Sequence, residues 1–528
     1  MRLTCNPVLA LVWVGFFLLL GFVSFKFAGH DHLTSFADDG GNYLIMAKSF
    51  SPYVDASALV EKASVHERYP PLFPAVLAYI GGAENVAVAS HFVLIMFLTA
   101  CVLLAVWASR VLKSQWLGLL ACMAYVVSPN VWPMLLRILS ENLYIVLTLL
   151  VLILAEPARK RGGYWISLVS LVLTLTILTR TIGITIIAAW FVYLLIDRSD
   201  SSVSLRAGLL SIAFPLSAAI AWTLASQAGE SHLYNTEISW LISKVFTSPH
   251  PRQEAIGYFS GQATAMYESW LGALMLVWAP GINMRTAAAS LLLLIVLSGW
   301  FIRLRRNCLD AWYSLFYLGV IFVWPFSGQF FRFILPLLPL FIVYAMQASQ
   351  MYFGRLVKSS SLIMPFTVGL VFMALSLPAI IFIYQRHGFT TTHGLDYSSN
   401  PEFYQLADPH QAQDKARQHL LLMRDMEKIK TTMPPKAKIM WFTPVYINLL
   451  AEREGVELPH ARGRRAMLDA IAENPPDYLY ISCLHPRKTS ENGLAMLAWV
   501  SGVGEIYWIS RNPVDQSIFS IMIKLKRE

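Results

Sequence analysis

The chain has 528 residues, of which 56% are hydrophobic and only 14% are charged. Because an ordinary soluble domain has about 25% charged residues, this composition predicts a polytopic membrane protein. It argues against a cytosolic enzyme, a disordered chain and a disulfide-stapled secreted domain. The net charge is +9, but in a membrane protein the loops that carry the charge matter more than its sum, so nucleic acid is not expected as a partner. The 5 cysteines form no framework, and no structural disulfide is expected.

Apolar runs recur along residues 1–384. A membrane span needs about 20 apolar residues, and about eleven runs qualify. They lie near 8–27, 86–108, 115–132, 139–156, 164–179, 181–196, 207–226, 286–302, 311–326, 332–350 and 362–384. Only Arg180 interrupts the stretch 164–196, which at about 1.5 Å per residue is too long for one span, so we predict a hairpin with Arg180 at its tip. Arg2 precedes the first run as in a signal peptide, but its length and the poor cleavage site after it favour a retained span.

Basic residues gather in alternate loops between these runs. With a cytoplasmic N-terminus, the inner loops carry clusters such as 159–161 and 303–306, whereas the short outer turns carry only Arg137, Arg180 or Arg332. This distribution follows the positive-inside rule. Three longer segments then lie outside the membrane: about 28–72, about 227–285 and everything after 385.

The outer segments differ in character. Residues 256–278 form an amphipathic, aromatic stretch that we expect along the membrane surface. Residues 385–528 are expected to form a domain separate from the membrane domain 1–384. After a polar linker, this part has a helical stretch near 401–430, helical patterns at 444–454 and 464–473, and β-rich runs at 438–442, 478–481, 506–509 and 518–524. The expected fold is therefore a polytopic α-helical membrane protein with about 11 transmembrane helices, plus a small C-terminal soluble α/β domain.

Polar residues at the predicted outer face are candidates for chemistry, because ionisable groups near a bilayer are costly and usually functional. Asp38 and Asp39 precede Gly40-Gly41, a pattern that suits a sharp turn presenting one carboxylate to a cavity. A second carboxylate nearby and shielding from water would raise its pKa and improve it as a general base. The alternative is an N-cap for a helix over 42–50.

Three further outer clusters contain arginine. Arg68-Tyr69 enters a proline-rich stretch, 70–74, and can act at a site or anchor the chain at headgroup level. Arg137 and Glu141 are spaced for an ion pair on one helix face. Arg332 stands among aromatic residues near two prolines, which predict a kink, and can either snorkel to the interface or bind a phosphate bidentately.

Together these clusters place acids and arginines on one side of the membrane. A lipid-embedded donor with a phosphate leaving group needs that combination: a base for the acceptor and cations for the departing phosphate.

The ordered set of motifs resembles the GT-C superfamily of integral-membrane glycosyltransferases, in the branch of protein O-mannosyltransferases and the bacterial lipid A aminoarabinose transferase. The matching motifs are the acidic pair with the helix 38–47, the Pro-Pro-Leu entry at 69–74, Leu-Ser-Glu-Asn at 139–142, the arginine turn at 178–180 and Phe-Arg-Phe-Ile-Leu-Pro at 331–336. Their order agrees over about residues 1–350. Asp39 stands where this branch commonly has Glu, and Phe333 where it has Tyr.

The resemblance implies transfer of a sugar from a polyprenyl-phosphate donor to an acceptor outside a bacterial plasma or inner membrane, with inversion. Asp39, or else Asp38, would be the general base, and Asp39 is favoured because it lies four residues before Tyr43. Arg332 would hold the phosphate, assisted by Arg68, Arg137 or Arg180, and Tyr69 and Glu141 would complete the substrate site.

No metal is expected to be obligatory, although Asp38, Asp39, Glu141 and His66 could assemble an oxygen-rich divalent-cation site. The acceptor, whether glycan, lipid or protein, is expected to be selected by the C-terminal domain.

Two other interpretations are open. A transporter or flippase of lipid-linked sugars could use the arginines, but transporters place their sites near the middle of the membrane. A scaffold with a membrane anchor would leave the many spans and the acidic outer loop unexplained.

Overall fold

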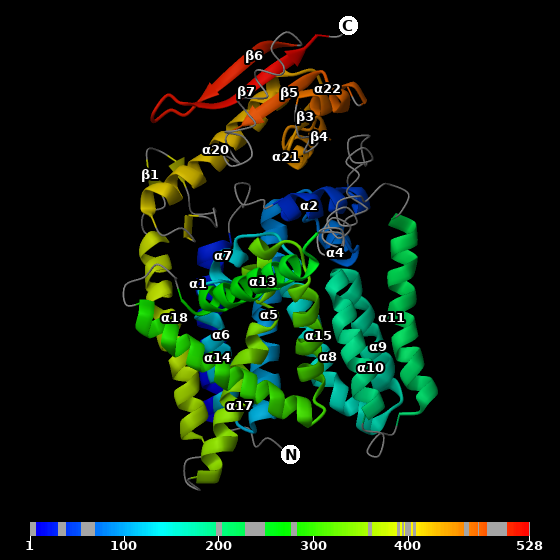
Figure 1. The fold of residues 1–528 in the computed structure, drawn as a ribbon, viewed down its shortest axis with the longest axis vertical. Helices are drawn as coiled ribbons and strands as arrows, with labels where there is room; N and C mark the ends of the chain where they lie inside the picture. The colour runs from blue at the N-terminus through cyan, green and yellow to red at the C-terminus, as the bar shows by residue number, and fades with distance from the viewer. Residues whose placement is uncertain are drawn as a thin grey trace.

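The computed structural model describes residues 7–29, 38–53, 69–196, 203–226, 249–275, 282–356, 362–387, 391–392, 395–396, 403–404, 408–458, 464–473, 475–482 and 504–526. Long helices lie side by side in a bundle, and a small domain with a sheet covers one end of it (Figure 1).

The bundle is built from the predicted apolar runs, each of which coincides with a helix. These helices are α1 (Pro7–Ala28), α5 (Val86–Leu112), α6 (Gln115–Val126), α8 (Glu141–Arg161), α9 (Tyr164–Thr179), α10 (Ile184–Ile196), α11 (Leu205–Ser226), α14 (Ile282–Arg305), α15 (Leu309–Phe322), α17 (Leu338–Leu356) and α18 (Ile363–His387). Among the described residues, 6 helices are long and apolar enough to cross a membrane, or 7 if one bent pair is a single span. Helices α6, α9, α10 and α15 are apolar but shorter, so the count of about eleven spans stays a prediction.

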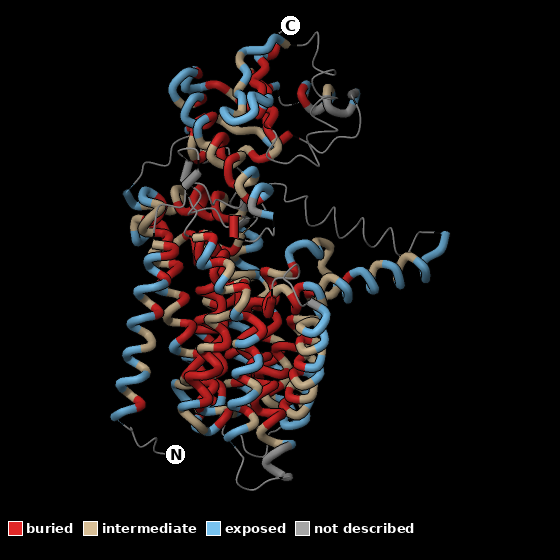
Figure 2. The backbone as a smooth tube through the Cα atoms, turned by 90° about the vertical axis from the view of Figure 1, so that its left-hand side faces the viewer, coloured by how far each residue is buried: buried red, intermediate tan, exposed pale blue. Residues whose placement is uncertain are grey.

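The outer helices are apolar on both their packed and their exposed faces. Leu11 on α1, Leu210 on α11 and Ile363 on α18 are 73%, 68% and 62% exposed. Figure 2 shows buried positions concentrated inside the bundle and exposed positions around it. Helices that are hydrophobic all round suit a lipid environment.

Two breaks between the apolar helices match the sequence. Arg180 has extended backbone between α9 and the short 3-10 helix η3 (Thr181–Gly183), so the helix breaks at the residue predicted for the hairpin tip. Near Pro336 the chain bends by 65° between the segment Ser327–Phe333 and the segment Leu338–Tyr352, which confirms the predicted kink. The first of these segments contains η4 (Ser327–Gln329) and α16 (Phe330–Phe333).

Short helices lie at the end of the bundle that carries the small domain. They are α2 (Asp38–Phe50), α4 (Leu72–Tyr79) and α7 (Val131–Leu135), and α13 (Pro251–Leu274) crosses the long helices nearby (Figure 1). The predicted sharp turn at 38–41 is wrong: the acidic pair and both glycines form the first turn of α2. The amphipathic stretch predicted at 256–278 corresponds to α13, which starts at Pro251, a residue favoured in a first helical turn.

The C-terminal domain has the predicted α/β character. Its five-stranded sheet has the order β4-β3-β5-β7-β6, with β3 parallel to β4 and β5, and β7 antiparallel to β5 and β6. Its elements are α20 (Pro409–Thr432), β3 (Lys438–Trp441), α21 (Pro444–Leu449), β4 (Glu454–Glu457), α22 (Arg464–Glu473), β5 (Tyr478–Ser482), β6 (Gly504–Arg511) and β7 (Ile518–Leu525), with a small β1–β2 hairpin (Thr391–Thr392 and Leu395–Asp396) before them.

Two predicted helical stretches of this domain have different outcomes. The described part of the stretch near 401–430 is helical at 403–404 and again from Pro409 to Thr432, where the Asp408 side chain caps the helix by accepting from the His410 N–H at 2.9 Å. The boundary predicted for the helix at 444–454 is wrong: this helix ends at Leu449, and the chain then forms β4 against β3.

The arrangement agrees with the predicted sidedness of the outer segments. Helices α2 and α4 and the C-terminal sheet lie at one end of the bundle, and α1 begins at the other (Figure 1). The described parts of 28–72 and of the chain after 385 therefore share a side. The assignment of that side to the outside of the cell, and the domain boundary at 384/385, stay predictions.

Candidate active site

Arg332 joins two carboxylates from distant parts of the sequence. It lies on the short helix α16, just before the bend, and its side chain is 8% exposed. Its Nε donates to Glu141 Oε1 and its Nη1 donates to Asp39 Oδ2. Arg332 therefore does not snorkel into solvent. The structure brings together three of the predicted outer clusters through this one guanidinium.

Glu141 also binds Arg180. Arg180 Nη1 lies 2.6 Å from Glu141 Oε1, so this oxygen accepts from two arginines. Glu141 is the first residue of α8, where the helix dipole favours a negative charge. Its second oxygen, Oε2, is buried and has no hydrogen-bond partner among the described residues.

The predicted pairing of Arg137 with Glu141 along one helix face is wrong. Helix α7 ends at Leu135 and α8 begins at Glu141, so Arg137 lies in the turn between the two helices. Helical i, i+4 geometry therefore does not apply. The Arg137 side chain is half-buried, and its backbone N–H donates to Met134 O at 3.2 Å.

A tyrosine holds the other oxygen of Asp39. Tyr69 Oη donates to Asp39 Oδ1 at 2.7 Å, and the Tyr69 ring packs on Tyr43, with centroids 4.8 Å apart. The hydroxyl of Tyr43 lies 2.9 Å from Ser140 Oγ. Tyr69 and Tyr43 thus connect Asp39 to Ser140, the residue before α8, in addition to the connection through Arg332 and Glu141. Sequence reasoning missed Ser140, although its position next to Glu141 was a signal for it.

The carboxyl of Asp39 stays ionised in this setting. Burial raises its pKa, but the charge of Arg332 and hydrogen bonds from Arg332 and Tyr69 outweigh burial and hold the pKa below its ordinary value of 3.8. The predicted rise in pKa is therefore wrong, because the nearest charge to Asp39 is a guanidinium. Burial and the neighbouring Asp39 carboxylate raise the pKa of Tyr69, so its hydroxyl stays a donor.

Some predicted residues lie outside the part of the chain that the structure describes. These are Arg68 and His66, and also the side chain of Asp38. Among the described residues, no group of three or more His, Cys, Asp or Glu side chains could hold a metal ion. The four charged groups of the described cluster, Asp39, Glu141, Arg180 and Arg332, balance to zero net charge.

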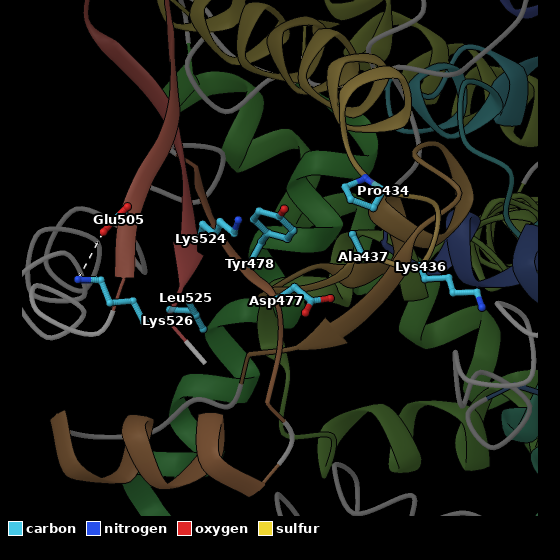
Figure 3. A pocket seen from close by; sticks show the side chains of 9 residues that line it. All are labelled: Pro434, Lys436, Ala437, Asp477, Tyr478, Glu505, Lys524, Leu525 and Lys526. Atoms are coloured by element: carbon cyan, nitrogen blue, oxygen red, sulfur yellow. Dashed lines mark ion pairs between the residues drawn. The ribbon is translucent and has the colours of Figure 1, made fainter. Parts of the chain in front are cut away.

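A separate cavity of about 780 Å³ opens in the C-terminal domain (Figure 3). Lys436, Asp477, Tyr478 and Lys524 line it. These residues gather at the ends of β3 and β5 where the two strands begin. Helix α21 follows the other end of β3 and packs on α2. The cavity and the contact with α2, the helix of Asp39, therefore lie at opposite ends of β3.

A comparison with solved structures finds two that are similar to this chain. ArnT from Cupriavidus metallidurans, solved bound to undecaprenyl phosphate, is 13% identical, and the match covers 97% of each chain with a TM-score of 0.50. The chain has the GT-C fold. An oligosaccharyltransferase from Archaeoglobus fulgidus, also a GT-C enzyme, matches 97% of this chain and 74% of its own with a TM-score of 0.48 and 10% identity. That structure carries a tethered acceptor peptide containing the NVT sequon.

The GT-C fold confirms the predicted fold class and, with the apolar helices, makes the chain a multi-pass membrane protein. No known family profile matches the sequence, and no curated protein matches it significantly. The likeness is therefore one of structure and not of sequence.

Proposed function

We propose that this protein is a glycosyltransferase that moves a sugar from a polyprenyl-phosphate donor to an acceptor on the outer face of a bacterial plasma or inner membrane. The observation that carries the proposal is the charged cluster in which Arg332 contacts both Asp39 and Glu141 at one end of an apolar bundle. The GT-C fold, shared with an ArnT structure that holds undecaprenyl phosphate, supports a lipid-linked donor.

The arginines supply the phosphate site. Arg332 and Arg180 stand at helix breaks near the end of the bundle, where the phosphate of a donor whose lipid lies among the spans would arrive. Cations fixed in a poorly hydrated site stabilise the charge that develops on a departing phosphate. Arg68 and Arg137 are proposed as further phosphate contacts, and Glu141 keeps Arg180 and Arg332 oriented.

Asp39 is the proposed general base, with Asp38 as the second candidate. The acceptor oxygen or nitrogen forms a bond to the anomeric carbon, and the bond from that carbon to the phosphate oxygen breaks. The phosphate leaves with the bonding electron pair, and the acceptor proton passes to Asp39. One displacement of this kind inverts the configuration.

Binding of the donor also prepares the base. A phosphate that binds Arg332 competes with Asp39 for the same guanidinium. As Arg332 turns to the phosphate, its lowering effect on the Asp39 pKa weakens, and burial, which raises that pKa, gains weight. A carboxylate with a higher pKa is the better base.

Substitution of the two aspartates tests this assignment. Purified Asp39→Asn and Asp38→Asn proteins are compared with the wild type for transfer from natural or short-chain polyprenyl-phosphate sugars, with a membrane extract as acceptor pool. We expect Asp39→Asn to lose about 10³-fold in rate, the middle of the range typical of general-base catalysis, and to retain donor binding. Asp38→Asn should keep most of the activity.

Other results lead to other conclusions. The reverse pattern would assign the base to Asp38. Donor binding by the wild type without any product, across several sugars, would overturn the transferase and favour a flippase. The position of the cluster at one end of the bundle argues against that alternative, because transporters bind their substrates near the middle of the membrane.

A further inference from the structure

Two successive glycines lie in the first turn of the helix that carries Asp39. A Cβ added at Gly40 would lie 3.1 Å from the backbone oxygen of Ile138, and one added at Gly41 would lie 2.8 Å from Val445 Cγ2. Neither glycine has a positive φ, so neither is required for backbone freedom. Glycine is a poor helix former, and close approach on two sides is what explains the pair.

These contacts place α2 between the membrane bundle and the C-terminal domain. Ile138 belongs to the turn before α8, whereas Val445 belongs to α21. Successive helical residues are rotated by about 100°, so Asp39 and Gly41 point to nearly opposite sides of α2. Asp39 therefore faces Arg332 while the C-terminal domain packs behind it.

Helix α21 is a firm support for this contact. Val445, Tyr446 and Ile447 are 6%, 2% and 0% exposed. The Tyr446 ring packs on Trp441 of β3, with centroids 6.0 Å apart. Buried residues of α2 and of α21 belong to one continuous hydrophobic core, so displacement of α21 would disturb α2.

The far end of α2 lies within electrostatic range of the C-terminal domain. Lys48 interacts electrostatically with Glu452, which forms an ion pair with Lys430 at 2.7 Å. Glu452 directly precedes Arg453 and β4, and Lys430 is on α20. The packing contact at Gly41 is thus accompanied by a charge interaction toward the other end of α2.

We propose that the C-terminal domain is a structural part of the membrane active site, in which Val445 is a positioning residue that holds α2 so that Asp39 meets Arg332. This inference rests on the proposed function and deepens it. On this proposal the C-terminal domain holds α2 in place during every transfer reaction, whichever acceptor is used. This role is additional to any part that the domain has in acceptor selection.

A double substitution tests the proposal in the full-length protein. In Gly41→Ala the new methyl group collides with Val445, which pushes α2 away from α21. We expect kcat to fall by about 10- to 100-fold, while the Kd for undecaprenyl phosphate changes by less than about threefold. Val445→Ala removes the colliding methyl groups, so the double variant should recover to within about threefold of the wild type.

Gly40→Ala is the matched control. Its methyl group meets a backbone oxygen of Ile138 and not a side chain that can be trimmed. We expect Gly40→Ala to lose activity and the added Val445→Ala substitution to give no rescue. Gel filtration in detergent checks that each variant is folded.

Each outcome has a distinct meaning. If Gly41→Ala had the kcat of the wild type, or if adding Val445→Ala did not raise the kcat of Gly41→Ala, the positioning role of Val445 would be overturned. The proposed glycosyl transfer would not be affected by either result. Rescue of Gly40→Ala by Val445→Ala would overturn it too, because relief would then not depend on the contact at Gly41. Absence of transfer by the wild type with every donor would overturn the proposed function and this inference together.

Discussion

Arg332→Lys should separate the role of the guanidinium from the role of its charge. Lysine keeps the positive charge but has one nitrogen, whereas Arg332 uses Nε for Glu141 and Nη1 for Asp39. In the proposed donor complex the phosphate takes the place of Asp39 at Arg332, so lysine loses either the contact to Glu141 or the contact to the phosphate. A hydrogen bond to a charged group contributes about 1.5–3 kcal/mol, and each 1.36 kcal/mol in the transition state is tenfold in rate. The predicted loss in kcat/KM for the donor is about 10- to 100-fold.

The buried arginine at the other end of the bundle provides a matched control. Arg303 Nε and Nη2 donate to Asp310 at 2.5 and 2.6 Å, and Nη1 donates to Gln347 at 3.0 Å. The side chains of Arg303 and Arg332 are 9% and 8% exposed. Arg303→Lys should therefore lower stability about as much as Arg332→Lys and leave the rate per folded molecule unchanged.

The assay measures transfer of labelled sugar by detergent-purified protein, normalised to the folded fraction from gel filtration. Thermal unfolding of both variants gives the stability comparison. If Arg332→Lys kept its kcat/KM within threefold of the wild type, or if Arg303→Lys lost as much activity, the argument for a specific contact at Arg332 would be refuted.

Three further predictions concern the base and the need for a metal. Tyr69→Phe removes the donor to Asp39 Oδ1, whose hydrogen bond lowers the Asp39 pKa, so that pKa should rise and the acid limb of kcat should move to higher pH; a rate profile against pH that matches the wild type would contradict this. Because the Asp39 pKa lies below 3.8 in the structure, kcat/KM for the donor, which reports the free enzyme, should show no loss above about pH 4. The acid limb of kcat, which reports the donor complex, should lie at higher pH. A chelator should leave the rate of the purified protein unchanged, and loss that Mg²⁺ or Mn²⁺ restores would show a required metal.

The depressed pKa also fixes the sign of its effect on stability. Ionised Asp39 stabilises the folded protein above the unfolded-state pKa of about 3.9. That contribution declines as pH falls through the lower folded-state pKa. Thermal unfolding of Asp39→Asn should therefore depend less on pH than that of the wild type below about pH 4.

Much of the fold could be predicted because a helix that crosses a bilayer needs a run of about 20 apolar residues. Long apolar runs gave the helices, and the lone Arg180 and the prolines near 336 marked the two breaks correctly. Strand β4 was missed because its sequence, Glu454–Glu457, has no apolar alternation and forms by pairing with β3. Such a strand depends on its neighbour and not on its own residues.

Several charged residues of the cluster could be predicted from the sequence, but their pairing could not. Ionisable groups in outer turns stand out against an apolar chain, which is why Arg332 and Glu141 were found. Local spacing suggested Arg137 as the partner of Glu141, yet the partners are Arg180 and Arg332, because α8 starts only at Glu141. The Asp39 pKa was predicted in the wrong direction for the same reason, since its charge partner is remote in sequence.

The breaks in the helices explain why this chemistry gathers where it does. Glu141 starts α8, Arg180 ends α9, and Arg332 lies on the short helix before the bend. A break in an apolar helix frees backbone groups that require polar partners, so these are the positions where charges at the edge of a bilayer are least costly. Mutual pairing lowers that cost further. In the proposed mechanism a donor phosphate takes the place of Asp39 at Arg332, so the two arginines keep two acidic partners while Asp39, freed from the guanidinium, accepts the acceptor proton.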